Sequence, residues 1–207
     1  MNNKKIVIID LDIGNVGSVK RAFENFGLNP KIEKKLKSDK EITHLVLPGV
    51  GSFDEGMKRI NINNLKDHII EMATVRKIPI LGICLGMQLL ASVGNENQKK
   101  TDGLNLIPGN VEKLEINKNF KLPHIGWNGV LQEKNNVLFK SVPSLTDFYF
   151  IHSYKFICKN IKNHIAKTNY CENFTSAINH ENIYGVQFHP EKSLGAGLQI
   201  IKNFSNL

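Results

Sequence analysis

The sequence predicts an α/β fold with a mostly parallel central sheet flanked by helices and a strand-rich C-terminal half. In the first half, short apolar runs such as residues 6–9 and 78–81 alternate with amphipathic segments such as residues 15–26. Strands that alternate with helices form a parallel sheet covered on both faces. In the second half, strand-like runs follow one another with few helical segments between them. A chain of 207 residues without an internal linker is expected to form one domain over residues 1–207.

Each predicted element rests on its pattern of apolar residues. Residues 6–10 form a short apolar strand, and residues 15–26 carry an apolar stripe at helical spacing that ends before Gly27, a typical C-cap. Further strands are expected at residues 30–33, 44–47 and 78–81, helices at 53–59, 65–77 and 85–91, and an exposed polar loop at 94–102. In the C-terminal half, strands are expected at residues 111–116, 148–152, 165–168, 175–178 and 183–188, and a closing helix at 195–204.

The composition limits the classes of partner. The formal charge is +8, but the lysines are scattered among asparagines and form neither a basic helix nor an aromatic motif that stacks on RNA. We therefore expect no nucleic-acid partner, although an acidic protein or a phosphorylated ligand remains compatible with such a surface. No apolar run approaches the roughly 20 residues that span a bilayer, and the first apolar run is too short for a signal peptide. No membrane association is expected.

The cysteines indicate the redox environment. Cys84, Cys158 and Cys171 are an odd number without the spacing of a disulfide framework, which favours a reducing cytosol and a cytoplasmic protein. No two of them have the spacing of a zinc site, so no metal is expected.

The motif GICLG at residues 82–86 places a thiol where a strand turns sharply into a helix. Glycines two residues before and two residues after Cys84 allow this turn without a Cβ clash. The turn puts Cys84 at a helix N-terminus, which favours the thiolate, and aims the Leu85 N–H at the oxygen of an attacked carbonyl. A lone GxCxG motif fits a buried structural cysteine equally well, so the chemistry depends on a partner for the thiol.

A partner follows the alternating run at residues 184–188, which leads into His189, Pro190 and Glu191. The residue before a proline is extended, and residues i and i+2 of an extended chain point to the same side. Glu191 can therefore accept a hydrogen bond from one imidazole nitrogen while the other nitrogen faces Cys84. We predict that Cys84 is a nucleophile, His189 its general acid and base, and Glu191 the group that orients the imidazole.

These residues are expected to meet at one edge of the sheet. Cys84, His189 and the glycine-rich turn at residues 48–51 each follow a predicted strand. Sites in open parallel sheets lie at the carboxyl ends of the strands.

At these residues the chain resembles the class I (triad) glutamine amidotransferases. The motifs GICLGMQ at residues 82–88 and GVQFHPE at 185–191 are similar to the family's nucleophile and His-x-Glu motifs. The motif PGVGSF at residues 48–53 resembles the family's glycine-rich oxyanion strand. The resemblance implies the family's α/β fold and hydrolysis of glutamine to glutamate and ammonia, without a metal or organic cofactor.

Narrower motifs resemble one branch of the family. Gly14-Asn15 with Ser18-Val19, PHIGWN at residues 123–128 and FIHSY at 150–154 are similar to the glutaminase subunits of imidazole glycerol phosphate synthase, essentially end to end. The resemblance implies that the ammonia passes to a separate (β/α)₈ cyclase subunit in a heterodimer. That subunit makes imidazole glycerol phosphate and AICAR in histidine biosynthesis.

The resemblance also implies roles for single residues. Amides of Val50, Gly51 and Leu85 would form the oxyanion hole, and Gly49, Gln88, His152, Ser153 and Tyr154 would hold glutamine. Asn15, Trp127, Tyr149 and Lys192 would lie on the surface that faces the cyclase. From the residues alone, Trp127 and Tyr149 could be core aromatics, Lys192 an ordinary surface lysine, and Asn15 a helix cap.

One departure from the family pattern leaves an alternative open. The family usually carries Asp-Tyr-Gly-x-Gly-Asn after the first strand, whereas residues 10–15 read DLDIGN. The acidic Asp12, in a loop expected to face the partner, suggests a glutaminase for a paralogous synthase that uses ammonia on another substrate, such as a sugar that is amidinated. A glutaminase of an anthranilate or GMP synthetase, a Cys-dependent peptidase and a nucleic-acid-binding protein are further alternatives, each with less support in the motifs.

Overall fold

The computed structural model describes residues 4–36, 41–96, 98–115, 117–118 and 120–207. The α-helices in these residues are α1 (Val16–Glu24), α2 (Phe53–Ile62), α3 (Lys66–Thr74), α4 (Leu85–Leu89) and α5 (Leu194–Ser205). Short 3-10 helices cover Val137–Phe139, Ile161–Asn163 and Pro190–Lys192. The strands are β1 (Ile6–Ile9), β2 (Lys31–Glu33), β3 (His44–Gly49), β4 (Ile80–Cys84), β5 (Val93–Glu96), β6 (Lys99–Asp102), β7 (Gly109–Lys113), β8 (His124–Gln132), β9 (Thr146–His152), β10 (Tyr154–Cys158), β11 (His164–Asn169), β12 (Asn173–His180) and β13 (Ile183–Val186). In this part of the chain no helix is long and apolar enough to cross a membrane.

Five strands form the parallel centre of the sheet, in the order β2-β1-β3-β4-β13. Beyond β13 the sheet continues through β12, β10 and β7 to β5 and β6, mostly in antiparallel pairs, while β11, β8 and β9 branch from β12. The predicted α/β fold is therefore confirmed, and the strand-rich C-terminal half supplies the antiparallel part of a large mixed sheet.

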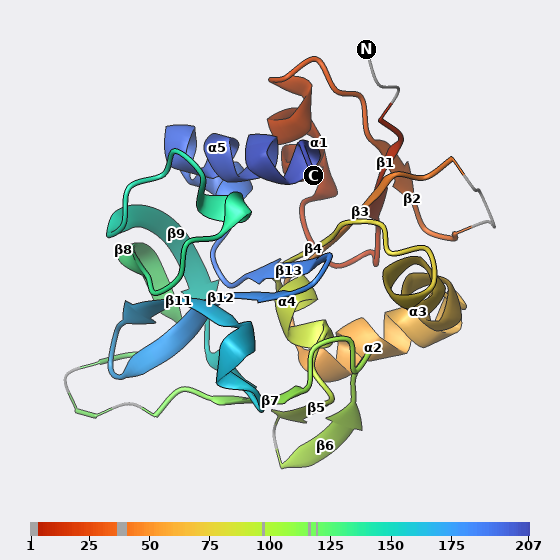
Figure 1. Ribbon diagram of the computed structural model, residues 1–207. Coiled ribbons are helices and arrows are strands. Elements are labelled where there is room, and N and C mark those ends of the chain that lie inside the picture. Colours follow the sequence, from red (N-terminus) through yellow and green to blue (C-terminus); the bar gives the residue numbers. More distant parts are fainter. Residues whose placement is uncertain (1–3, 37–40, 97, 116, 119) are drawn as a thin grey trace.

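Alternate residues of the parallel strands enter two hydrophobic cores, one on each face of the sheet. In β1, Val7 and Ile9 belong to the core that α2, α3 and α4 cover, whereas Ile6 and Ile8 belong to the core that α1 and α5 cover (Figure 1). Every residue of β1 and of β4 is buried. Strands covered on both faces carry continuous apolar runs, which explains why these two were recognisable in the sequence.

Helix α1 is shorter than predicted. Asn15 caps its start by accepting a hydrogen bond from the Ser18 N–H at 3.1 Å. The helix ends at Glu24, and Asn25, not Gly27, is its C-cap. The Asn25 side chain donates to the Arg21 carbonyl at 2.9 Å, so an amide satisfies a terminal acceptor before the glycine is reached. Gly27 lies two residues further on, with a φ of +70°.

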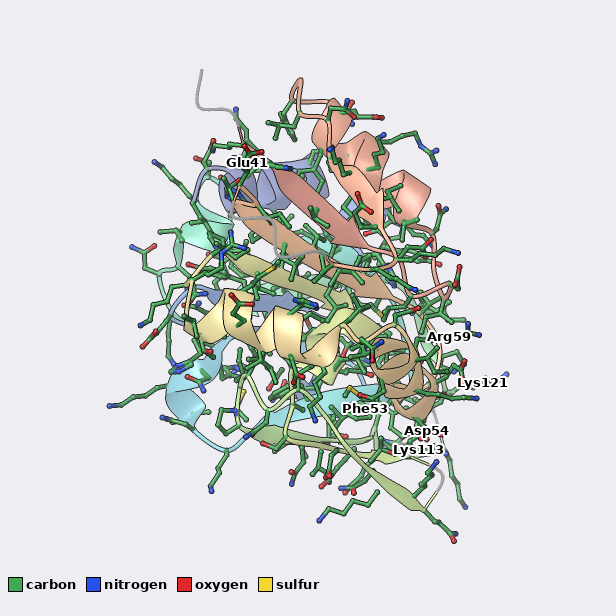
Figure 2. The ribbon with its side chains drawn as sticks, turned by 90° about the vertical axis from the view of Figure 1, so that its right-hand side faces the viewer. Glu41, Phe53, Asp54, Arg59, Lys113 and Lys121 are labelled. Atoms are coloured by element: carbon green, nitrogen blue, oxygen red, sulfur yellow. The ribbon has the colours of Figure 1, made fainter. Side chains whose placement is uncertain are left out.

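The exposed loop predicted at residues 94–102 is wrong, because this segment forms the antiparallel hairpin of β5 and β6. The hairpin is the edge of the sheet, where polar residues are tolerated, and β5 pairs with β7 on its inner side. It also packs on the start of α2, whose residues Phe53 and Asp54 are labelled in Figure 2. The Phe53 N–H donates to Glu96 at 2.6 Å, and Lys99 pairs with Asp54 at 2.8 Å. Gly94 lies so close to Phe53 that a Cβ would be 2.4 Å from its ring.

Strands β8 and β10 are further elements that the sequence pattern did not reveal. β8 contains Gly126 and Gly129, which weaken a strand pattern, and it is held by its full-length pairing with β9. A single residue, Ser153, separates the end of β9 from the start of β10. The strand predicted at residues 111–116 is present as β7, and its last predicted residue, Ile116, lies outside the described residues.

Burial of His44 gives the fold a pH dependence. The side chain of His44 is buried and lies edge-on to the ring of Phe204 in α5, with 5.4 Å between the ring centroids. Burial, aided by the charge of Lys4, lowers the pKa of His44 to about 4. The unfolded chain binds this proton near pH 6.5, so the contribution of His44 to the unfolding free energy is present above pH 6.5 and is lost as the pH falls towards 4.

We predict that His44→Leu makes the fold less sensitive to acid. Between pH 7 and pH 5 the parent should lose about 2 kcal/mol of unfolding free energy through this imidazole, and the variant should not. Urea unfolding at the two pH values measures the difference, with His180→Leu as a control that removes an exposed imidazole. Equal losses in the parent and in His44→Leu would contradict the assignment.

Candidate active site

Cys84 occupies the junction of β4 and α4 in a backbone conformation that non-glycine residues rarely adopt. Its φ is 54° and its ψ is −110°, and its side chain is buried. A conformation of this kind costs on the order of 1–3 kcal/mol and persists only where the surrounding structure imposes it. Here the strand is held on both sides, because Cys84 pairs with Gly49 of β3 and the preceding residue, Ile83, pairs with Val186 of β13. The sharp strand-to-helix turn expected from the sequence is present.

The two glycines of the motif are required by close backbone contacts. A Cβ on Gly82 would lie 2.7 Å from the backbone of Gly86, and a Cβ on Gly86 would lie 1.6 Å from the Leu47 carbonyl oxygen. Both distances are far shorter than van der Waals contact. The spacing GxCxG is therefore dictated by the packing of the turn against β3 as well as by its dihedral angles.

His189 and Glu191 lie beside this turn because β13 is the parallel neighbour of β4. His189 Nδ1 is 2.8 Å from Glu191 Oε1, and each side chain is only 4% exposed. The backbone around the imidazole is held as well: the His189 N–H donates to the Tyr149 carbonyl at 2.9 Å, and the Ser193 hydroxyl donates to the His189 carbonyl at 2.6 Å. The carboxylate thus fixes Nδ1 as the protonated nitrogen and leaves Nε2 for the thiol.

The pKa of His189 reflects this environment. Burial disfavours the imidazolium, but the negative charges of Cys84 and Glu191 outweigh burial and raise the pKa of His189 to about 10. His189 Nε2 is buried and makes no hydrogen bond of normal geometry in the described residues, although Cys84 is close enough to shift its pKa. Hydrogen bonds of this kind are often poorly aligned until substrate binds. At neutral pH His189 is a proton donor.

Two of the residues predicted to hold a substrate converge on the backbone carbonyl of a third. Gln88 Nε2 donates to the Tyr154 carbonyl at 3.0 Å, and His152 Nδ1 is 2.8 Å from the same oxygen. The backbone of Ser153, between His152 and Tyr154, accepts a hydrogen bond from the Leu114 N–H at 2.9 Å. The structure therefore ties α4 to the link between β9 and β10 and gives this segment a fixed conformation.

A buried histidine pair supports the same segment. His124 Nδ1 is 3.1 Å from His152 Nε2, and burial lowers the pKa of His124 to about 4 and that of His152 to about 3. Both imidazoles are therefore neutral at pH 7. Because His152 Nδ1 must donate to the Tyr154 carbonyl, its Nε2 is an acceptor and His124 Nδ1 is the donor. Both histidines are therefore packed and hydrogen-bonded.

The predicted oxyanion residues directly follow two paired strands, Val50 and Gly51 after β3 and Leu85 after β4. Leu85 is the first residue of α4, so its N–H has no acceptor within the helix. Val50 is 40% exposed, and Gly51 has a φ of +112° that favours glycine. A small cavity of about 20 Å³ is lined by Gly49, Val50, His189, Glu191, Lys192 and Asn15, among others. The role of the Val50, Gly51 and Leu85 amides as oxyanion donors stays a prediction.

Three of the predicted interface residues, Trp127, Tyr149 and Lys192, contact one another, and Lys192 also lines this cavity. Trp127 is 48% exposed and lies edge-on to Tyr149, with 6.1 Å between the ring centroids. Lys192 Nζ lies 5.5 Å above the Tyr149 ring, and Lys192 and Asn15 line the same cavity. Trp127 is therefore a surface residue and not a core aromatic, whereas Asn15 caps α1 and faces the cavity as well.

The loop that departs from the family pattern is tied to the rest of the structure. Leu11 is buried in the core that α2 and α3 cover, and Asp12 forms an ion pair with Lys34. The acidic side chain of Asp12, which suggested a different partner protein, is therefore paired with a lysine of its own chain.

Gln187 is a residue of this site that sequence reasoning missed. It is fully buried, and its Nε2 lies 3.7 Å from Cys84 Sγ. The alternation of an extended chain could have found it, because this alternation puts Gln187 on the same side as His189. Glu191 lies instead in the short 3-10 helix Pro190–Lys192, so the predicted pair is present but the extended conformation expected after His189 is wrong.

Comparison with known proteins agrees with these observations. The family model described as glutamine amidotransferase class-I matches residues 7–206. The chain belongs to this family. Two amidotransferase relatives are the imidazole glycerol phosphate synthase subunit HisH 2 of Methanococcus maripaludis, 42% identical over 96% of this chain and 98% of the relative, and the subunit HisH of Leptospira borgpetersenii, 40% identical over 98% and 100%.

Solved structures support the amidotransferase fold. A glutamine amidotransferase from Thermotoga maritima superposes with a TM-score of 0.70 at 20% identity and covers all of this chain and 84% of that one. The structure of PurLQS from Thermotoga maritima gives a TM-score of 0.72 at 16% identity over 98% of each chain. At these identities the likeness extends to the fold alone.

The close contacts of the nucleophile turn can be tested with glycine substitutions. We predict that Gly86→Ala lowers the unfolding free energy by about 3 kcal/mol or more, because the added Cβ would overlap the Leu47 carbonyl oxygen. Gly195→Ala, in open space at the start of α5, should change stability by no more than about 1 kcal/mol. Urea unfolding measures both, and a Gly86→Ala variant as stable as the parent would show that the turn tolerates a side chain.

Proposed function

We propose that this amidotransferase is the glutamine-hydrolysing subunit of an imidazole glycerol phosphate synthase and acts in histidine biosynthesis. The observation that carries the proposal is the buried Cys84, His189 and Glu191 arrangement on a strained strand-to-helix turn. The relatives reported above share about two residues in five along the full chain and carry the name of this synthase. Those names favour this synthase over a paralogous one that amidinates a sugar.

The first half of the reaction forms a thioester. The Cys84 thiolate attacks the side-chain amide carbon of glutamine, and the carbonyl oxygen becomes an oxyanion that accepts hydrogen bonds from the Leu85 N–H and from an amide of Val50 or Gly51. His189, protonated at neutral pH, gives its proton to the leaving nitrogen, and the C–N bond breaks to release ammonia. Each oxyanion donor is typically worth about 3 kcal/mol in acyl transfer.

The second half of the reaction restores the enzyme. His189, now neutral, takes a proton from water, and the resulting hydroxide equivalent attacks the thioester carbon. The C–S bond breaks, glutamate leaves, and the Cys84 thiolate again faces a protonated His189. Glu191 keeps the imidazole in one orientation through both steps by its 2.8 Å contact with Nδ1.

The segment between β9 and β10 is proposed to hold the substrate. Both amide hydrogens of Gln88 are used within the protein, on the Tyr154 carbonyl and on Gln187, so its Oε1 is the atom left to accept from the α-amino group of glutamine. Backbone groups of Gly49 and of His152 to Tyr154 would bind the α-carboxylate and α-amino groups. The rigidity of this segment favours one position of the amide carbon relative to the sulfur.

The partner is proposed to be a separate (β/α)₈ cyclase subunit, bound as a heterodimer over the cluster of Trp127, Tyr149 and Lys192. Trp127 is an exposed aromatic side chain, the type of residue that anchors protein interfaces. Lys192 of this cluster and Asn15 line the small cavity that His189 also lines, so ammonia released there would leave towards the partner. The free cysteines Cys84, Cys158 and Cys171 fit a cytoplasmic enzyme.

The proposal predicts glutamate release that depends on Cys84 and on the cyclase. We expect weak hydrolysis by the purified chain alone, because ammonia released without a partner would be wasted. Adding the cognate cyclase and its ribonucleotide substrate should stimulate turnover strongly. A coupled glutamate assay measures both rates, with Cys84→Ala as the control that should abolish them.

Two other outcomes would change the proposal. Turnover that needs Cys84 but ignores this cyclase would keep the triad and point to another synthase. High turnover of the isolated chain, equal with and without the cyclase, would contradict its dependence on a partner.

A further inference from the structure

A buried amide contacts the nucleophile and has no part in the reaction steps given above. The side chain of Gln187 is fully buried directly after β13. Its Nε2 lies 3.7 Å from Cys84 Sγ in hydrogen-bonding geometry, and its Oε1 accepts from Gln88 Nε2 at 2.9 Å. One amide therefore joins the nucleophile to a residue of the proposed substrate site.

The orientation of this amide is fixed by its neighbours. The two ends of a glutamine amide are distinguished by their hydrogen-bond partners. Gln88 also contacts the Tyr154 carbonyl, which only accepts, so the Gln88 atom that makes both contacts is nitrogen. That nitrogen requires the oxygen of Gln187 as its acceptor, and the N–H end of Gln187 is left facing the sulfur. The backbone N–H of Gln187 also donates to the Ser176 carbonyl at 2.9 Å, which anchors the residue on β12.

The sulfur has a second polar contact, and this one favours the neutral thiol. The Ile151 carbonyl oxygen lies 3.7 Å from Cys84 Sγ. A carbonyl accepts a hydrogen bond from a neutral thiol but repels a thiolate, whereas an amide N–H stabilises a thiolate. Hydrogen bonds to charged groups are stronger than those between neutral groups, and burial strengthens them further. Gln187 therefore favours the nucleophilic form, as the imidazole of His189 does.

We propose that Gln187 is a catalytic residue of this glutaminase, whose N–H holds the Cys84 thiolate in line with the substrate carbonyl. Its oxygen at the same time holds Gln88 by a hydrogen bond, so the same side chain fixes the position of the sulfur relative to Gln88 and to the glutamine that Gln88 would bind. The proposal rests on the proposed glutaminase function. It predicts that loss of the amide reduces the fraction of Cys84 present as thiolate and disturbs the alignment of the sulfur. Glutamine binding should change less.

The test compares the parent with Gln187→Met and Gln187→Asn. Methionine has a similar volume and no amide, and asparagine keeps the amide but is one methylene too short to reach the sulfur. The pH dependence of Cys84 alkylation by iodoacetamide, read on the Cys84 peptide by mass spectrometry, reports the thiolate. We expect its midpoint to move to higher pH in both variants and kcat to fall by roughly tenfold or more, with KM changed less.

Gln199→Met is the matched control, because Gln199 also donates its amide to a side chain, Asn203, but lies on α5 away from the thiol. It should leave the alkylation profile and kcat unchanged. Thermal unfolding shows which variants are folded. If Gln187→Met does not fold, the alkylation profile and kcat of Gln187→Asn test the proposal. A folded Gln187 variant with the parent's alkylation midpoint and kcat would overturn the proposal. A parent that hydrolyses no glutamine would instead refute the proposed function, and the alkylation profile would still test the contact.

Discussion

The site depends on one backbone constraint, the left-handed conformation of Cys84 at the end of β4. It persists because β4 lies between two parallel neighbours, with Gly49 beside the cysteine on β3 and Val186 beside Ile83 on β13. The same pairing brings His189 to the sulfur, since it follows β13 by three residues. A strained conformation of this kind persists only where the surrounding structure imposes it, and here the two neighbouring strands and the cores on both faces of the sheet do so.

Burial then assigns a charge state to each histidine near the sulfur. His189 is buried next to a carboxylate and a sulfur that can carry negative charge, so its pKa rises to about 10 and it remains a proton donor. His124 and His152 are buried beside each other without a carboxylate partner in the described residues, and burial lowers their pKa values to about 4 and about 3. The protein thus places a charged imidazole at the nucleophile and neutral ones behind the substrate segment. Two neutral histidines can form a directional hydrogen bond to each other, which two charged ones could not.

Local motifs predicted the elements and residues that depend on short stretches of chain. The turn at Cys84 and the all-apolar β1 are of this kind, because sterics and apolar patterning within a few residues determine them. The His189 and Glu191 pair was predicted from an extended chain but forms through the 3-10 helix Pro190–Lys192. The hairpin of β5 and β6 was missed because its polar strands form only through pairing with β7 and packing on Phe53. β8 was missed for a similar reason, since its glycines are held by β9.

The meeting of distant residues was only partly predictable. Parallel strands explain why Cys84 and His189 share one edge of the sheet. The convergence of Gln88 and His152 on the Tyr154 carbonyl depends on how β10 crosses from β9 to β7, and no local pattern encodes that path. The contact of Gln187 with the sulfur was within reach of alternation but required the position of α4 to be recognised.

Covalent labelling with a glutamine analogue that carries an electrophilic diazoketone tests the central claim, that Cys84 is the nucleophile of a glutamine site. The three cysteines serve as controls for one another, and burial raises the pKa of Cys158 to about 12, which makes it a poor nucleophile. Peptide mass spectrometry should find the adduct on Cys84 alone, formed more slowly when glutamine is present. An adduct spread over all three cysteines, or formed at the same rate with glutamine, would contradict the account.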